Sequence, residues 1–465
     1  MSKHPPSTPS RRSQGQGSSR GRSAAHPARV HPPVAQPAAP ARAMLAALTA
    51  LEAQTGRISG DERIERAIEA GAKLNAEPFR LRGLIDRWFR HAQRLRYVAE
   101  TSGLGTGLIA RWAVFAALIE KRPPEAILPV MRGAANGEMA DAAALRRAIT
   151  TGFDHRAMPE AVGLELPEDF FPLFKRAFGP RLQQEALASL IAPPTTVRVN
   201  TLKGTREEAI ESLARENIRA EPALLSPLGL VFKQRADIAK LDAFTSGLIE
   251  VQDEGSQIIA MLADVRPGMQ VLDFCAGAGG KTLALAAAME NKGHLVAADT
   301  HAKRLQRARV RLKRAGAENA ERVLLTGEEN DPWLRKNAGK FERVLVDAPC
   351  TGTGSWRRNP DARASITLEE LGRLTELQAK LLVRARRLVK PGGMLIYSTC
   401  SVLLEENDDI TDAFLRNHPE ARPVDLATIF ESKSAAPWPG DGPTRLQLTP
   451  ALHGTDGFYA AAFAF

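Results

Sequence analysis

Short apolar runs alternate with stretches of helical periodicity between residues 251 and 465. The runs fall at 270–274, 294–299, 322–326, 343–347 and 394–398, and helical spacing is clearest at 303–314 and 368–389. Such alternation predicts a Rossmann-like, doubly wound α/β domain with a parallel sheet. A further apolar run at 458–465, after 444–448, indicates a hairpin that closes the sheet.

Two smaller units precede this domain in the pattern. Residues 43–155 repeat apolar side chains at helical spacing, as at Leu81, Leu84 and Trp88, which predicts a helical domain. Residues 156–250 predict a small α/β RNA-binding module. Within it, the stretch 195–202 alternates like a strand, and a capping box at 205–208 begins a helix.

Composition adds a basic tail and indicates a class of partner. Residues 1–42 hold seven Lys or Arg, no acid and few large apolar residues, which predicts a disordered tail. The whole chain carries a net charge of +10 with a pI of about 9.7, which favours nucleic acid over a membrane surface as partner. Three cysteines, no apolar run of transmembrane length and no signal-type segment indicate a cytoplasmic protein.

A glycine-rich turn follows the first apolar run of the large domain. Glycines allow a sharp turn and a close backbone approach to a ligand, and the helix that follows offers free N–H groups. Asp299 ends the next run, where a carboxylate accepts hydrogen bonds from ribose hydroxyls. The spacing fits neither a P-loop nor a dinucleotide fingerprint. We therefore expect a ligand with ribose and adenine but no pyrophosphate, such as S-adenosylmethionine.

All three cysteines, Cys275, Cys350 and Cys400, lie at or just after the ends of expected parallel strands. Ligands bind at that edge of an open α/β sheet. A metal site is not expected, because no Cys-x-x-Cys pair or spaced histidine partner is present. Asp347 ends the strand before Cys350, so two thiols and a carboxylate can converge near a methyl donor.

That combination suits methylation of carbon 5 of cytosine. A thiolate that adds to carbon 6 makes carbon 5 nucleophilic, and a carboxyl group assists at ring nitrogen 3. The carbon 5 proton must then leave, and a second thiol can serve as that base or position it. The base must be flipped out or single-stranded to be reached.

Five motifs in order resemble the RNA 5-methylcytosine methyltransferases of the Sun-domain type. They are the stretches 251–257, 275–281, 347–350, 398–401 with Glu406-Asn407, and 453–458. The resemblance implies that Cys400 is the nucleophile and that Cys350 assists release of the methylated RNA. It also implies that Asp347 is a catalytic residue that contacts the cofactor. Ala278 stands where Pro is frequent in the family, and Glu328 where Asp is common.

The resemblance also implies a set of cofactor contacts. These are Cys275, Ala276, Gly277, Ala278, Gly279, Gly280, Lys281, Asp299, Glu328 and Asp347.

The partner is expected to be RNA, with ribosomal RNA first and tRNA second, and the protein is expected to be a monomer. Arg198, Asn200 and Arg357 are the candidate RNA contacts, although each could equally be a solvated side chain. Two other functions stay open: a methyltransferase with another acceptor, and a non-catalytic RNA-binding assembly factor on the same fold.

Overall fold

The computed structural model describes residues 38–54, 60–134, 141–153, 157–328 and 330–465. Most of the predicted tail therefore lies outside the described residues. The prediction of disorder is wrong for residues 38–42, because the first helix already begins at Ala38. The helices of the N-terminal region are α1 (Ala38–Glu52), α2 (Gly60–Ala72), α3 (Pro78–Arg90), α4 (Ala92–Thr101), α5 (Leu108–Leu118), α6 (Pro124–Ala134) and α7 (Ala142–Thr151).

The N-terminal helices share one apolar core. Trp88 of α3 and Phe115 of α5 meet edge to face with ring centroids 5.7 Å apart, and Trp112 is fully buried beside them. The helical periodicity of the sequence thus marks the buried faces correctly.

Three short helices follow: α8 (Glu160–Gly163), α9 (Phe171–Phe178) and α10 (Leu182–Ala188). The apolar side chains of α9 and α10 pack with Trp356 and Val402 of the large domain. The first part of the segment expected as a small α/β module therefore contributes to a core shared with the large domain.

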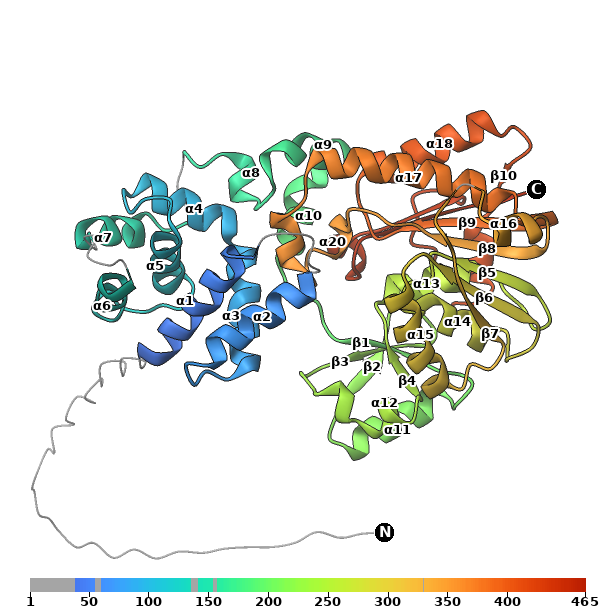
Figure 1. Cartoon of the computed structure of the whole chain (residues 1–465), viewed down its shortest axis with the longest axis horizontal. Helices are drawn as coiled ribbons and strands as arrows, with labels where there is room; N and C mark the ends of the chain where they lie inside the picture. The colour runs from blue at the N-terminus through green and yellow to red at the C-terminus, as the bar shows by residue number, and fades with distance from the viewer. Residues whose placement is uncertain (1–37, 55–59, 135–140, 154–156, 329) are drawn as a thin grey trace, which may run out of the picture. The chain divides into compact units, whose positions relative to one another are not determined.

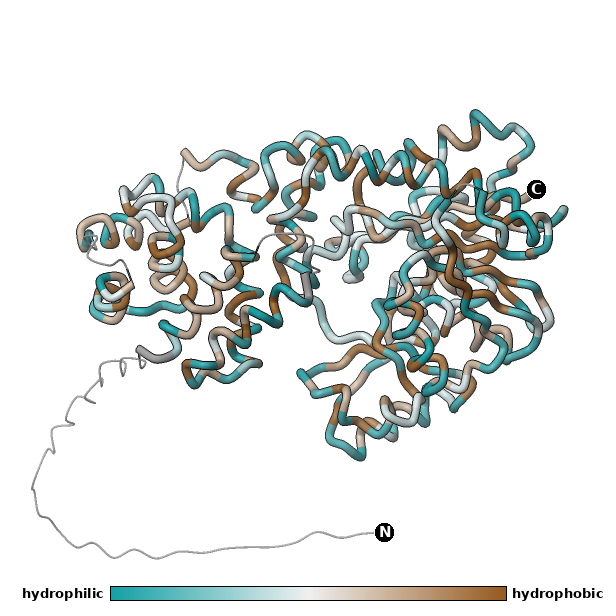
Figure 2. The backbone as a smooth tube through the Cα atoms, in the orientation of Figure 1, coloured by the Kyte–Doolittle hydropathy of each residue, from teal (hydrophilic) through white to brown (hydrophobic). Residues whose placement is uncertain are grey.

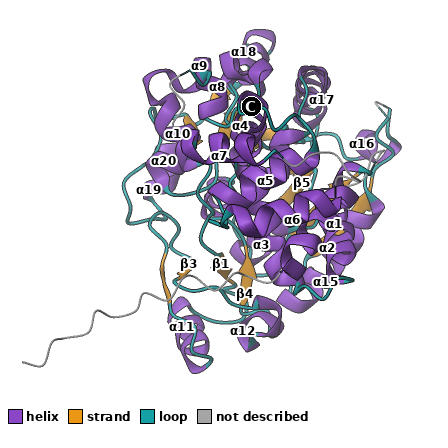
Figure 3. Ribbon diagram, turned by 90° about the vertical axis from the view of Figure 1, so that its left-hand side faces the viewer, coloured by secondary structure: helices purple, strands orange, loops and turns teal. Residues whose placement is uncertain are grey.

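The small sheet itself is antiparallel, with strand order β2-β3-β1-β4. Its elements are β1 (Thr196–Val199), α11 (Arg206–Arg215), β2 (Ala220–Pro222), β3 (Gly229–Phe232), α12 (Asp242–Thr245) and β4 (Ile249–Val251). Figure 3 shows α11 and α12 lying against one side of these strands. The predicted capping box is confirmed, since the Thr205 side chain accepts from Glu208 N–H and Glu208 accepts from Thr205 N–H.

The large sheet has the strand order β10-β12-β9-β8-β5-β6-β7, and β11 pairs with β12. Its strands are β5 (Gln270–Phe274), β6 (His294–Asp299), β7 (Ala320–Leu324), β8 (Phe341–Asp347), β9 (Val389–Thr399), β10 (Arg422–Pro423), β11 (Arg445–Leu448) and β12 (Phe458–Ala464). Strands β5 to β9 are parallel to their neighbours, whereas β12 is antiparallel to β9. The predicted doubly wound sheet and its closing hairpin are both confirmed.

Helices cover both faces of this sheet (Figure 1). They are α13 (Glu254–Leu262), α14 (Gly280–Ala288), α15 (Ala302–Ala315), α16 (Pro332–Lys336), α17 (Leu368–Arg386), α18 (Asp408–Asn417), α19 (Leu426–Glu431) and α20 (Pro450–His453). Leu272 packs with the core under α17, and its neighbour Val271 with the core under α13 and α14. Both faces are buried, which is why these strands are continuously apolar in sequence and in Figure 2.

Candidate active site

The turn after β5 is shaped by its backbone. Gly277 and Gly279 have φ values of 58° and 79°, and Cys275 has a φ of 78° without being glycine. The N–H groups of Cys275 and Ala276 both donate to the carbonyl of Ala298 at the end of β6. The turn then enters α14 at Gly280, so the first N–H groups of a helix point out of the carboxyl edge of the sheet.

Asp299 fixes this turn to the neighbouring strand. Its Oδ2 accepts from Gly277 N–H at 2.8 Å, and its Oδ1 accepts from His301 N–H at 2.7 Å. Oδ1 also lies 3.2 Å from Nδ1 of His301, whereas Oδ2 has a second lone pair. Asp299 therefore orders the glycine turn and retains acceptor capacity at Oδ2 toward the cavity that it lines.

Asp273 inside β5 was not foreseen as part of the site. It is fully buried and accepts a hydrogen bond from the Thr282 hydroxyl of α14 at 2.6 Å. Burial raises the pKa of Asp273 to about 7, although the hydrogen bond from Thr282 opposes this. The strand and the helix on either side of the turn are thus joined below it.

Lys281 of α14 is buried and forms an ion pair with the partly exposed Asp347 at the end of β8. Lys281 Nζ lies 2.7 Å from Asp347 Oδ2, and the Ser398 hydroxyl donates to Asp347 Oδ1 at 3.0 Å. Burial lowers the pKa of Lys281. The charge of Asp347 and its hydrogen bond raise that pKa by more than burial lowers it, so the net change is upward. The ammonium group therefore stays charged and orients the Asp347 carboxylate.

Cys350 and Cys400 come together at the same edge. Cys400 follows β9 directly and Cys350 lies three residues after β8, so these parallel neighbours bring the sulfur atoms within 3.3 Å. The hydrogen bond with Cys400, and then burial, raise the pKa of Cys350 well above its usual range. The Cys350 thiol is therefore held protonated at neutral pH. Cys275 lines the same cavity, and burial likewise raises its thiol pKa.

The Cys350 loop is held by a buried carboxylate. Glu406 accepts from the N–H of Thr351 at 2.8 Å, from the Thr351 hydroxyl, and from Nε2 of Gln378 at 3.0 Å. Gln378 also donates to the carbonyl of Pro349 at 2.9 Å. The residues on both sides of Cys350 are thereby fixed by side chains from α17 and from the turn before α18.

The same loop is joined to the Cys400 strand through backbone contacts. Gly354 N–H donates to the carbonyl of Cys400 at 3.0 Å, and Gly457 N–H donates to the carbonyl of Gly354 at 2.8 Å. A Cβ atom at Gly354 would lie 2.2 Å from the carbonyl oxygen of Gly457. Glycine at 354 is therefore required for close approach and not for its φ angle.

Arg357 is buried in an ion-pair cluster, which corrects the expectation that it lies free for RNA or solvent. It pairs with Asp456 at 3.0 Å, and Arg358 bridges Asp456 and Asp253 at 2.8 and 3.0 Å. Burial, followed by the charge of Asp456, raises the pKa of Asp253 to about 6. From the opposite side Arg90 of α3 donates to the carbonyl of Arg357 at 2.5 Å.

The expectation that Arg198 and Asn200 contact RNA or solvent is also corrected, because the face of the strand that carries them is buried. Arg198 donates to Gln252 Oε1 at 2.8 Å, and Nδ2 of Asn200 donates to the carbonyls of Gly247 and Ala315. The side chains instead connect β1 to β4 and to the end of α15. The alternation along the strand was interpreted correctly, but the second face is covered by the large domain.

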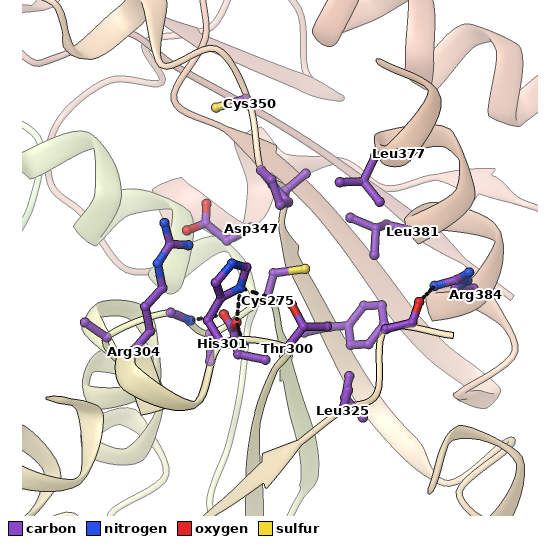
Figure 4. Close-up of a pocket in the computed structure, with 18 of the residues that line it drawn as sticks. Cys275, Thr300, His301, Arg304, Leu325, Asp347, Cys350, Leu377, Leu381 and Arg384 are labelled. Carbon is purple, nitrogen blue, oxygen red and sulfur yellow. Dashed lines mark hydrogen bonds and ion pairs between the residues drawn. The ribbon is translucent and has the colours of Figure 1, made fainter. Parts of the chain in front are cut away.

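A cavity of about 1300 Å³ connects the glycine turn with Cys350 and Cys400. Figure 4 shows Cys275 and Cys350 among the side chains that line it. Its walls include apolar side chains that the sequence patterns did not single out, namely Leu325, Leu334, Leu377 and Leu381. Leu377, Leu381 and Arg384 share one face of α17, and Arg384 donates to the carbonyl of Gly327 at 3.2 Å. The stripe was visible in the sequence, but its destination was not.

The lining fits an adenosine-bearing cofactor. The helix N-terminus and the Asp299 carboxylate suit polar groups, and the leucines suit a flat apolar ring. Glu328 lies at the exposed part of this wall, whereas the nearby Asp331 is buried and accepts from the N–H groups of Thr326 and Trp333. Among the described residues, no group of three His, Cys, Asp or Glu could hold a metal ion.

Comparison with known proteins identifies the family. Residues 260–464 match the family described as 16S rRNA methyltransferase RsmB/F, and residues 166–239 match the ferredoxin-like domain of RsmF/B-like methyltransferases. A ribosomal RNA small subunit methyltransferase B from Pseudomonas syringae is 36% identical over 65% of this chain and 68% of its own length. The chain belongs to the RsmB/F family.

Members of the RsmB/F family are S-adenosylmethionine-dependent methyltransferases. Two further curated relatives, both 36% identical, are matched over 63% and 59% of their own length. The matched family models leave the helical region before residue 166 uncovered.

Solved structures show the same fold. The crystal structure of PH0851 has a TM-score of 0.73 and 25% identity, with 93% of this chain and 100% of that chain covered. NSun6 from Pyrococcus horikoshii, crystallised with SFG, has a TM-score of 0.56 and 20% identity, over 64% of this chain and 98% of that one.

None of the helices that the structure describes has the length and apolar character of a membrane span.

Proposed function

We propose that this RsmB/F member methylates carbon 5 of a cytosine in ribosomal RNA through a covalent bond between Cys400 and carbon 6. The observation that carries the proposal is the thiol pair, 3.3 Å apart, in the cavity that also contains the glycine turn. Ribosomal RNA is favoured over tRNA because the Pseudomonas relative is named for the small ribosomal subunit.

Each group at the site has a distinct role in this proposal. Cys400 adds to carbon 6, which makes carbon 5 nucleophilic. Ring nitrogen 3 takes up the proton that the Cys400 thiol releases, and Asp347, oriented by Lys281 and Ser398, accepts a hydrogen bond from the protonated nitrogen. The bound cofactor supplies the methyl group.

Cys350 serves the second half of the reaction. After methyl transfer the proton on carbon 5 must leave before the Cys400–carbon 6 bond can break. Cys350 lies beside Cys400 and is protonated at rest, so its own thiol proton must pass to solvent or to a second base before its thiolate can act. We assign it the removal of the carbon 5 proton, or the positioning of the group that removes it.

The three cysteines allow a matched experiment. Cys400→Ala, Cys350→Ala and Cys275→Ser are each expressed in cells, and the purified proteins are run on denaturing gels to detect covalently bound RNA. Cys350→Ala should accumulate an adduct, because addition proceeds while release fails, and Cys400→Ala should give none. Cys275→Ser is the control for the loss of a cavity thiol, since it should bind the cofactor more weakly but should accumulate no trapped adduct.

The trapped RNA identifies the substrate. Sequencing should return a cytosine in small-subunit ribosomal RNA, whereas a tRNA sequence would redirect the substrate assignment. Methylation by Cys400→Ala at the wild-type rate would exclude the covalent mechanism. RNA binding by the wild type without any turnover would indicate an assembly factor on the same fold.

A further inference from the structure

Helix α15, which follows Asp299, has an unusual charge pattern. Its sequence AKRLQRARVRLKRA contains seven Lys or Arg in 14 residues and no acid. Lys303 and Arg304 occupy the first turn, where the positive end of the helix dipole disfavours cations. Lys303 and Arg307, like Arg309 and Lys313, are four residues apart and repel one another.

Helix α17 shows the opposite arrangement. Glu369 and Glu370 lie in its first turn, and Arg384 and Arg386 in its last. Oppositely charged side chains also pair along its surface, as between Lys380 and Glu376. Two long helices on the same sheet therefore differ in that the charges of α17 stabilise the helix and those of α15 oppose it.

Only part of the α15 charge is neutralised within the protein. Arg311 and Arg314 both pair with Glu250, at 3.2 Å in the case of Arg311. In the described portion of the chain, the remaining cations are exposed and have no carboxylate within ion-pair distance. These are Lys303, Arg304, Arg307, Arg309 and Lys313.

These cations lead away from the active-site cavity. Arg304 lines the cavity itself. At the other end of α15, Lys203 of the small module lies beside Gly316, where a Cβ atom would be 3.1 Å from its Nζ. A helix of this length spans about 20 Å. The five exposed cations of α15 and Lys203, called the basic row below, therefore extend from the cavity to the small module.

We propose that the exposed cations of α15, together with Lys203, bind the phosphate backbone of the RNA next to the target nucleotide. The inference rests on the proposed function, because it needs RNA as the substrate. A membrane surface fits less well, since the apolar side chains Leu305, Ala308 and Leu312 are buried against the sheet. Phosphate contacts carry no sequence information, so this row sets affinity and orientation and leaves base selection to the cavity.

The test removes three charges from α15 in the full-length protein. The variant is Lys303→Gln, Arg307→Gln and Lys313→Gln, and Arg304 is retained because it lines the cofactor cavity. The matched control is Lys336→Gln, Lys340→Gln and Arg387→Gln. These exposed cations lie near the amino ends of β8 and β9, at the opposite edge of the sheet.

The probe is a fluorescent single-stranded RNA of mixed sequence, titrated at several KCl concentrations. The α15 variant should lose at least about tenfold in affinity, and the slope of log affinity against log salt should fall by about two, at roughly 0.7 for each lost contact. The control should change less than about twofold. Methylation by the α15 variant should show a raised KM for RNA and an unchanged kcat.

Further variants and readouts separate the possible failures. Lys303→Arg with Lys313→Arg keeps the charges and should bind RNA as the wild type does, even if the Gln variant folds poorly. Equal RNA affinity and salt slope in the Gln variant and the control would overturn the proposal. Wild-type protein that binds RNA but forms no Cys400 adduct would refute the proposed function and leave the phosphate contacts standing.

Discussion

The loops after β5 and β8 reach the same cavity by different means. The glycine turn after β5 is held by backbone torsions, by a helix N-terminus and by Asp299 on the adjacent strand. The Cys350 loop after β8 is held by side chains from distant parts of the chain, above all Glu406 and Asp456. The glycine turn can thus be built locally, whereas the Cys350 loop depends on the completed tertiary structure.

The largest expected effect comes from a glycine-to-alanine substitution in the Cys350 loop, which we compare with the same substitution in the glycine turn. Gly354→Ala places a Cβ against the backbone of Gly457, which cannot move cheaply. Methylation should fall at least about a hundredfold, because displacements of this size are enough to misalign reacting groups. Gly277→Ala has no protein atom within 4 Å, so its cost is the left-handed φ, about 1–2 kcal/mol.

Steady-state kinetics and thermal unfolding of both glycine variants provide the check. Gly277→Ala should mainly raise the KM for the cofactor and retain turnover. If Gly354→Ala remained as active as Gly277→Ala, the close approach of the two glycines would have no catalytic importance.

A smaller effect is expected at the carboxylate that holds the Cys350 loop. Glu406→Gln replaces one of two acceptor oxygens by a donor that faces Thr351 or Gln378, which leaves a buried clash of donors. We expect kcat to fall at least about tenfold and the Cys400 adduct to accumulate, since Cys350 is displaced. Glu405→Gln is the matched control, because Glu405 pairs with Arg176 at the surface. The gel assay for covalent RNA reports both variants.

The corresponding change in the glycine turn should affect binding more than turnover. Asp299→Asn retains an acceptor for only one of the two N–H groups of Gly277 and His301. The dissociation constant for S-adenosylmethionine should rise by about tenfold, equivalent to about 1.4 kcal/mol. Calorimetric titration measures it directly. An unchanged affinity would mean that the turn orders itself without this carboxylate.

The last effect concerns stability and not activity, and it is a change in the pH dependence of unfolding. Asp273 has a pKa of about 7 in the folded protein, against about 3.9 when unfolded. The native state therefore keeps a proton that the unfolded state releases, and stability falls by up to about 1.4 kcal/mol per pH unit as pH rises from 4 to 7. Asp273→Asn should remove this part of the slope. Urea unfolding of both proteins at pH 5 and pH 7.5 tests it.

The difference between the loops also explains what could be predicted from sequence. The strand ends, the glycine turn, Asp299 and the convergence of the three cysteines follow from local periodicity and from the common edge of parallel strands. The structure confirms these placements. The assigned roles of Cys400, Cys350 and Glu328 stay predictions.

The remaining features depend on contacts between residues far apart in the chain. Arg357 looks solvated in sequence because its partner Asp456 lies 99 residues later. Arg198 and Asn200 look solvated because nothing in an isolated strand shows that the large domain covers its second face. The leucines of α17 form a visible stripe, but only the packed structure shows that they line a cavity.

Arg90 connects the helical region directly to the Cys350 loop. Its guanidinium group is buried and donates to two backbone carbonyls, those of Leu190 and of Arg357. A displacement of α3 would therefore leave the Arg357 carbonyl without this donor. A ligand whose affinity depended on the position of α3 would be coupled to the Cys350 loop through this contact, by the same factor in both directions.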